Sequence, residues 1–214
     1  GAMLGKSMMR PPVHCFFCVH KKGGIVVQNK RLLMLVEIAI FSTLAFVLDF
    51  ITLFKMPQGG SVTISMIPVF IVAIRWGLKA GLASGAIFGF LQLIYAGIAI
   101  NVVQGVFEYV VAFLVLGFAG LFSKQINSAL NNESRGSLVT WIVTATFVAS
   151  SLRYLAHVVA GIYWWSAYTP EGQTVLGYSL VYNATYMLPS FILSAIICVI
   201  IFITRPALIV QKAA

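Results

Sequence analysis

The sequence predicts an all-α integral membrane protein with six transmembrane helices. Hydrophobic residues make up 60% of the 214 residues and charged residues 9%, and the mean hydropathy is +0.98. A soluble domain carries about 25% charged residues, so this chain lacks the polar side chains needed to cover its surface in water. Its apolar residues fall into six runs, and a helix needs about 20 such residues to cross a bilayer. Strand-like alternation is absent, which argues against a β-barrel.

The six expected spans are separated by polar connectors. They cover residues 31–54, 62–74, 80–99, 102–122, 138–165 and 178–204. The second run is short for a full crossing, and the third is rich in glycine, which permits close helix packing. Pro57, Gly59 and Gly60 mark a turn-rich first loop. Residues 123–137 are expected to form a polar linker with its tip at 131–134, and Pro189 is expected to kink the last span.

The basic residues predict how the spans are oriented. If the N-terminus is cytoplasmic, the cytoplasmic loops receive Lys21, Lys22, Lys30, Arg31, Arg75, Lys79, Lys124, Arg135, Arg205 and Lys212. The outer loops then receive only one base, Lys55, together with Glu171. This asymmetry follows the positive-inside rule, so we expect both termini in the cytoplasm. Membrane orientation also accounts for the formal charge of +9, and no nucleic-acid partner is expected.

We expect three parts along the chain. Residues 29–206 form the six-helix transmembrane domain, and residues 207–214 form a cytoplasmic C-terminal tail. Residues 1–28 are interpreted as an expression scar, Gly1-Ala2-Met3, followed by a basic irregular tail. This tail carries two histidines and two cysteines between residues 14 and 20, which are too close together for a tetrahedral cage. No metal site is therefore expected.

One face of the fifth span carries polar and aromatic residues. Arg153, His157, Gly161 and Trp165 recur every three or four residues and therefore lie on one side of a helix. Polar groups at membrane depth are costly and should face a protein interior or a cavity. The adjacent Trp164 is expected to face lipid. We interpret the face that carries Trp165 as one wall of a ligand site.

Two further spans bring polar groups to the same outer level. Glu108 lies about two turns below the outer surface, where its carboxylate either pairs with Arg153 or accepts a hydrogen bond from a cationic or amine-bearing ligand. The sixth span begins with Tyr178, Tyr182, Asn183 and Tyr186. Together these groups predict an outward-facing pocket for a small, aromatic, cationic solute.

The two acidic residues of the first span are expected to have structural roles. Glu37, near the cytoplasmic end, should pair with a nearby base. Asp49, near the outer end, should cap the helix or anchor a loop.

Four segments taken together carry a resemblance to a known family. They are FEYVVA (residues 107–112), GFAGLF (117–122), RYLAHVVAG (153–161) with Trp165, and YSLVYN (178–183). On these segments the chain resembles, from residue 30 to residue 206, the thiamine-specific substrate-binding (S) component of energy-coupling factor (ECF) vitamin transporters. The resemblance implies six helices with cytoplasmic termini in a bacterial plasma membrane.

The resemblance also implies residue roles. The thiamine pocket would be lined by Glu108, Tyr109, His157, Gly161, Trp165, Tyr178 and Asn183, with Arg153 where the family commonly has a basic residue. Phe88 would stand at an aromatic pocket wall, and the first loop would act as a lid. Ala39 and Thr43 would contact the transmembrane coupling subunit, where the family has an Ala-x-x-x-Ala pattern. Gly59-Gly60-Ser61-Val62-Thr63 replaces the tryptophan and glutamate that some members carry near the lid.

The resulting hypothesis is a high-affinity thiamine receptor that is not an enzyme and needs no cofactor. Because the chain has no Walker motif, a coupling subunit and two ATPase subunits would supply energy. One alternative is an S component for another cationic or heteroaromatic vitamin or precursor. Another is a membrane-embedded enzyme that uses Glu108 and His157 as acid and base. A self-contained secondary transporter is disfavoured because no internal repeat is visible.

Overall fold

The chain is a helical membrane protein, as predicted. A computed structural model describes residues 30–96 and 100–209. The expected N-terminal tail at 1–28 with its Cys/His cluster lies outside the described residues, as do residues 210–214 of the expected C-terminal tail at 207–214. Within these described residues, five helical stretches are long and apolar enough to cross a membrane: Lys30–Asp49, Leu78–Ala96, Val102–Asn131, Arg135–Trp164 and Val175–Thr204. A shorter apolar helix, Met66–Trp76, has 11 residues, which is about half of a full span.

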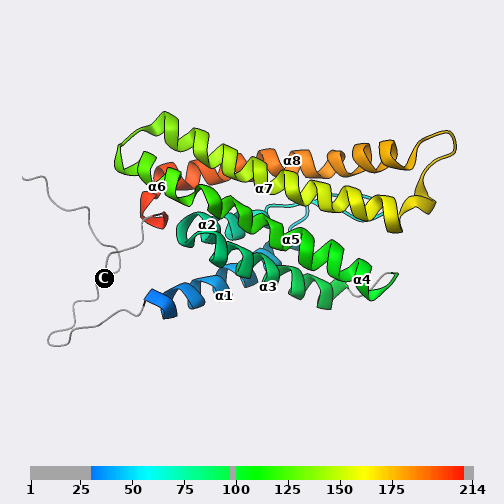
Figure 1. The fold of residues 1–214 in the computed structure, drawn as a ribbon, viewed down its shortest axis with the longest axis horizontal. Helices are drawn as coiled ribbons and strands as arrows, with labels where there is room; N and C mark the ends of the chain where they lie inside the picture. Colours follow the sequence, from blue (N-terminus) through cyan, green and yellow to red (C-terminus); the bar gives the residue numbers. More distant parts are fainter. Residues whose placement is uncertain (1–29, 97–99, 210–214) are drawn as a thin grey trace, which may run out of the picture.

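The helices run back and forth along one common axis (Figure 1). In chain order the elements are α1 (Lys30–Asp49), β1 (Phe54–Lys55), β2 (Ser61–Val62), α2 (Met66–Trp76), α3 (Leu78–Ala96), α4 (Val102–Gly105), the π-helical η1 (Val106–Val111), α5 (Ala112–Leu114), the 3₁₀-helical η2 (Val115–Phe122), α6 (Ser123–Asn131), α7 (Arg135–Trp164), η3 (Ser166–Tyr168), α8 (Val175–Thr204) and η4 (Pro206–Leu208). The strands β1 and β2 pair as a short antiparallel hairpin.

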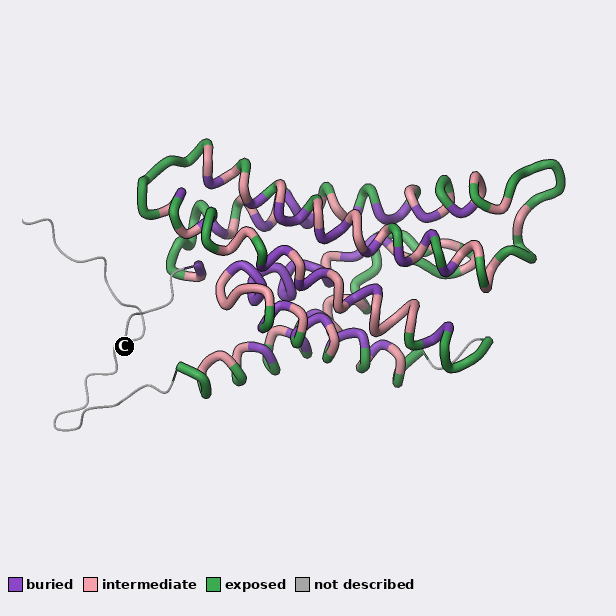
Figure 2. Tube along the Cα trace, viewed as in Figure 1, coloured by how far each residue is buried: buried purple, intermediate pink, exposed green. Residues whose placement is uncertain are grey.

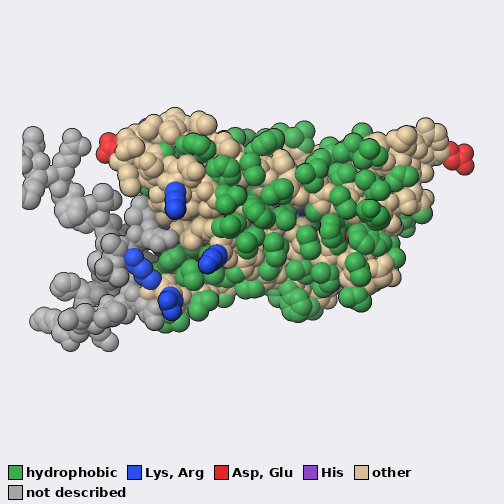
Figure 3. Space-filling view, in the orientation of Figure 1, with side chains coloured by type: hydrophobic (Ala, Val, Ile, Leu, Met, Phe, Trp, Pro, Cys, Tyr) green, Lys and Arg blue, Asp and Glu red, His purple; other side chains and the backbone are tan. Residues whose placement is uncertain are grey.

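The short helix α2 lies in the middle of the bundle. It contacts α1, α3, η2 and α8, and every residue from Met66 to Ile74 is buried. A helix that is apolar on all sides is stable only when neighbours cover all of them. Figure 2 shows the buried residues on the inner sides of the helices and the exposed residues on the outer sides. The face seen in Figure 3 carries hydrophobic side chains along most of its length, and many large apolar side chains are exposed, as expected for contact with lipid.

Glycine residues let α3 pack closely against α5 and η2, as the glycine content of the third run predicted. A Cβ atom added to Gly85 would lie against the carbonyl oxygen of Phe113, and one added to Gly117 would lie against the backbone of Leu82. Close backbone contact of this kind is how small residues stabilise helix pairs in membranes.

The polar linker predicted over residues 123–137 is wrong in its first half. Residues up to Asn131 continue the helix as α6, and the turn is confined to the expected tip, where Glu133 has a φ of 52°. Ile126 and Ala129, three residues apart, are buried against the bundle. The many polar side chains of this segment cover only its outer side, so overall polarity was a poor guide to its structure.

Basic residues are concentrated at one end of the molecule. The start of α1, the end of α2, the start of α3, α6, the start of α7 and the end of α8 all lie at this end in Figure 1. The Lys and Arg side chains visible in Figure 3 gather there as well. The hairpin carries the basic residue Lys55, and the loop between α7 and α8, which carries Glu171, lies at the opposite end in Figure 1.

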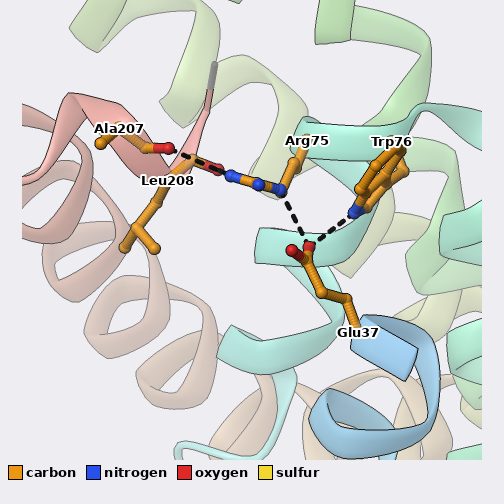
Figure 4. A network of polar contacts seen from close by, with 5 residues as sticks. All are labelled: Glu37, Arg75, Trp76, Ala207 and Leu208. Atoms are coloured by element: carbon orange, nitrogen blue, oxygen red, sulfur yellow. Dashed lines mark hydrogen bonds and ion pairs between the residues drawn. The ribbon is translucent and has the colours of Figure 1, made fainter. Parts of the chain in front are cut away.

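Glu37 forms the structural ion pair that was predicted for it (Figure 4). Its Oε2 atom lies 2.9 Å from Arg75 Nε and accepts a hydrogen bond of 2.6 Å from Trp76 Nε1. Arg75 Nη1 donates to the carbonyl oxygens of Ala207 and Leu208, each at 3.0 Å. These contacts connect α1, α2 and η4 at the basic end.

Candidate functional site

A pocket with a volume of about 660 Å³ lies between the end of α1, the hairpin, α3, η1, α7 and α8. It is in the half of the bundle away from the basic end. Every residue predicted for the site lines it: Glu108, Tyr109, Arg153, His157, Gly161, Trp165, Tyr178 and Asn183. The structure therefore brings together groups that are up to 75 positions apart in the chain (183 minus 108).

Glu108 is held by two donors from different helices. Trp165 Nε1 donates to one carboxylate oxygen and Gln104 Nε2 donates to the other. Gln104 is fully buried, and its backbone N–H donates to the side chain of Asn101, which caps the helix start (2.8 Å). Glu108 also sits in the π-helical segment η1, and such segments are frequent at functional sites. The carboxylate is thus oriented before any ligand arrives.

Arg153 contacts His157 and an aromatic ring rather than Glu108. Its Nε donates to His157 Nε2 at 3.4 Å, and its guanidinium carbon lies 4.2 Å from the centroid of the Phe113 ring. In the described part of the chain, no ion pair joins Arg153 to Glu108. The ion-pair alternative raised from the sequence is therefore not the arrangement seen. A cation over a ring face in a desolvated site is a favourable contact.

Gly161 and Asn183 lie where α7 and α8 pack against each other at the pocket. The Ser179 hydroxyl occupies the space that a side chain at 161 would need. Asn183 Nδ2 donates to the Ser179 carbonyl (2.8 Å), and Tyr186 Oη donates to Asn183 Oδ1 (2.6 Å). Asn183 is buried, as expected for an amide at membrane depth. Its side chain is fixed by its own helix.

The hairpin covers the pocket and is attached to α8. Tyr178 Oη donates to Gln58 Oε1 (2.8 Å), and Tyr182 Oη donates to the carbonyl oxygen of Gly59 (2.9 Å) while accepting from the Gln58 N–H (3.0 Å). Gly60 has a φ of +88°, and a Cβ atom there would lie 2.6 Å from the Tyr186 ring. Sequence reasoning identified this loop but missed Gln58 as its contact point.

Asp49 anchors the hairpin, as predicted for a loop anchor, and it also lines the pocket. Thr63 Oγ1 donates to Asp49 Oδ1 (3.0 Å), and Gln92 Nε2 donates to Oδ2 (2.5 Å). Gln92 was missed because nothing in the third run set it apart except its polarity inside an apolar helix. That polarity is a usable signal.

The two adjacent tryptophans have different surroundings, as expected. Trp165 follows the last residue of α7 and lines the pocket, whereas Trp164 packs on Phe107 with ring centroids 5.8 Å apart.

The expectation that Phe88 forms an aromatic pocket wall is wrong. Phe88 is fully buried behind Phe113, at a centroid distance of 4.2 Å, and does not line the pocket.

Comparison with known proteins identifies the family. Residues 35–210 match the profile of the family described as thiamine transporter protein (Thia_YuaJ). This chain belongs to that family. The resemblance inferred from the four segments is thus confirmed.

Relatives match over most of their length. The thiamine transporter ThiT of Bacillus subtilis is 43% identical over 185 residues, which cover 85% of this chain and 96% of that protein. ThiT of Lacticaseibacillus paracasei is 31% identical over 193 residues, covering 86% of this chain and 94% of the relative. A solved structure of ThiT from Listeria monocytogenes superposes with a TM-score of 0.80 at 34% identity, covering 86% of this chain and all of that one.

The pocket offers hydrogen bonding and aromatic surfaces in one place. It combines carboxylates, amides, an imidazole and phenol groups with the indole ring of Trp165. Among the residues that the structure describes, no group of three or more His, Cys, Asp and Glu side chains is placed to hold a metal ion. Hydrogen-bonding groups beside aromatic surfaces in one pocket suit a small organic molecule.

Proposed function

We propose that this chain is the thiamine-binding S component of an ECF-type, ATP-driven vitamin importer. The observation that carries the proposal is the Glu108 carboxylate, held by Trp165 and Gln104 inside a deep pocket. Family membership supports the substrate, because the relatives from Bacillus subtilis and Lacticaseibacillus paracasei are named thiamine transporters.

Thiamine combines an aminopyrimidine with a positively charged thiazolium ring, and the pocket suits both. Glu108 would accept hydrogen bonds from the aminopyrimidine, with Tyr109 and Tyr178 nearby. Trp165 and His157 would flank the rings, so that π-faces and the carboxylate meet the thiazolium charge. Asn183 would take the hydroxyethyl end, and Arg153 would orient the imidazole. A volume of about 660 Å³ lies within the range of about 300–1,000 Å³ for small-molecule sites.

We also propose six membrane crossings with both termini in the cytoplasm. The second crossing would combine α2 with the hairpin, because the 11 residues of α2 alone are too short. The concentration of basic residues at one end supports that end as the cytoplasmic one. Residues 29–206 would form the substrate-binding domain, flanked by the tails at 1–28 and 207–214.

The outer face of α1 is proposed to contact the transmembrane coupling subunit, which would connect this chain to two ATPase subunits. Ala39 and Thr43 are both exposed on it, next to the exposed apolar side chains of Ile40 and Leu44. Thr43 Oγ1 donates to the Ala39 carbonyl (2.9 Å). This internal hydrogen bond leaves the face free of unsatisfied donors, which favours close helix packing.

Titration with thiamine should quench the tryptophan fluorescence of the purified protein. The quenching should be saturable at sub-micromolar thiamine, because Trp165 lies in the pocket and would stack on the ligand. Trp165→Ala should abolish both the signal and high-affinity binding measured by calorimetry. Trp164→Ala is the matched control, since Trp164 packs on Phe107 outside the pocket, and it should retain binding. Absence of both quenching and binding heat in the unmodified protein would refute the thiamine assignment.

Cysteine labelling should report the proposed orientation. In a variant whose own cysteines are replaced, Glu171→Cys in intact cells should react with a membrane-impermeant maleimide. Glu133→Cys should react only after the cells are permeabilised, because residue 133 lies in the turn between α6 and α7 at the basic end. Both positions are exposed, so accessibility alone does not distinguish them. The reverse pattern would show that the orientation is wrong.

A further inference from the structure

Asp49 joins three parts of the pocket and is not among the residues predicted for the site. It is the last residue of α1, and its side chain lines the pocket. Its oxygens accept from Thr63, which directly follows the hairpin, and from Gln92 on α3. Both donors are buried, with 3% and 6% of their surface exposed. The carboxylate therefore has a fixed position at the pocket wall.

The hydrogen-bond directions around Asp49 all run toward the carboxylate. The single hydroxyl proton of Thr63 is donated to Asp49 Oδ1. In its contact with Ser65 Oγ (2.8 Å) Thr63 must therefore accept. Gln92 also donates. These contacts suit an ionised carboxylate, which can only accept hydrogen bonds.

The enclosed charged side chains of the pocket carry a surplus negative charge only when Asp49 is counted. Among the described residues, the charged side chains that line the pocket are Asp49, Lys55, Glu108 and Arg153. Lys55 belongs to the exposed strand β1, where water screens its charge. The other three carry two negative charges and one positive charge. Arg153 is 8% exposed and lines the same pocket as Asp49. Without Asp49, Arg153 and Glu108 would cancel and the enclosed pocket would be neutral.

We propose that Asp49 offsets the charge of Arg153 and so leaves the pocket with one surplus negative charge, which selects a cationic ligand over a neutral ligand of the same shape. Asp49 acts through Arg153 as a specificity-determining residue. The inference rests on the proposed function, because the thiazolium ring of thiamine supplies the positive charge. A cation that leaves water for an enclosed site loses hydration, and an opposite charge in that site must compensate.

The test compares two ligands on the purified protein: thiamine and its uncharged isostere, in which carbon replaces the quaternary ring nitrogen. Asp49→Asn keeps the shape and the oxygen that Thr63 needs, and the Gln92 amide can rotate to accept from the new NH₂ group. We expect the unmodified protein to bind thiamine more tightly than the isostere. In Asp49→Asn the ratio of the two dissociation constants should shift about tenfold toward the isostere. An unchanged ratio of the two dissociation constants in Asp49→Asn would overturn the proposal.

Two further variants separate charge from hairpin anchoring. Thr63→Val removes the hydroxyl that binds Asp49 but leaves every charge in place. The affinities for both ligands should fall together, and the ratio should stay as in the unmodified protein. If Thr63→Val changes the ratio as much as Asp49→Asn does, the effect comes from the hairpin and the proposal fails.

Arg153→Gln tests the charge proposal independently if Asp49→Asn does not fold. Removing the positive charge should raise the preference for thiamine by about tenfold, and the double variant Asp49→Asn/Arg153→Gln should return to the preference of the unmodified protein. No change in Arg153→Gln would overturn the proposal. An unmodified protein that binds no thiamine would refute the proposed function and this inference together, whereas unchanged ratios in a thiamine-binding protein refute the inference alone.

Discussion

Glu108→Gln should reduce the affinity for thiamine by about two to three orders of magnitude. The carboxylate is oriented by Trp165 and Gln104, and the proposed ligand donates to it and carries the opposite charge. Losing one partner of an enclosed, hydrogen-bonded charge pair costs about 2–5 kcal/mol. Glutamine preserves the size of the side chain. Its NH₂ group must face either Trp165 Nε1, which is a donor, or Gln104, whose amide would have to rotate and give up the hydrogen bond that its oxygen accepts from the Ile100 N–H. The orientation of residue 108 is therefore weakened in addition to the loss of its charge.

Isothermal titration calorimetry on the purified variant measures this loss directly. Glu171→Gln is the matched control, because it makes the same chemical change at an exposed loop position, and its dissociation constant should equal that of the unmodified protein. A Glu108→Gln variant that binds thiamine within threefold of the unmodified protein would show that the carboxylate does not contact the ligand.

Gly117→Ala should strongly destabilise the contact between η2 and α3. The added methyl group would meet the backbone atoms of Gly81 and Leu82 on α3, and backbone cannot rotate away as a flexible side chain can. Overpacking of this kind costs about 1–3 kcal/mol or more. Alanine has the better helix propensity, by up to about 1 kcal/mol, and this gain only partly offsets the cost. We expect the apparent unfolding temperature in detergent to fall by several degrees, or folded protein to be lost.

Gly136→Ala provides the comparison. Residue 136 lies in the first turn of α7, and a Cβ atom there would have no heavy atom within 4 Å. The same substitution should therefore leave the unfolding temperature unchanged or raise it, through the better helix propensity of alanine. Equal unfolding temperatures for Gly117→Ala and the unmodified protein would mean that α3 and η2 can separate without cost.

The polar face of the fifth span could be predicted because it depends on local geometry. Residues three or four apart on a helix share one side, and membrane depth makes polar side chains turn inward. These two facts correctly directed Arg153, His157 and Trp165 to one cavity. The same reasoning placed Trp164 outside it, where it packs on Phe107.

The partners of those residues could not be predicted, because they depend on how neighbouring helices are rotated and how closely they approach. Arg153 could have reached Glu108 by depth alone, yet Phe113 and His157 are the groups beside it. Gln104 and Glu108 are four residues apart, so even an ordinary α-helix would place them on one side, but the chain becomes π-helical at this point. Nothing in the composition of residues 102–111 predicts this change in helical geometry.

The sequence by itself determined that the chain is a helical membrane protein, that its basic residues lie at one end, and which polar side chains face inward. Each of these follows from the cost of removing polar groups from water and from the helical repeat. Only the tertiary structure decided that Gln58 attaches the hairpin to α8, that α6 continues a helix through a polar segment, and that Asp49 brings a second carboxylate to the pocket. These features are contacts between distant segments, and packing of the whole bundle selects them.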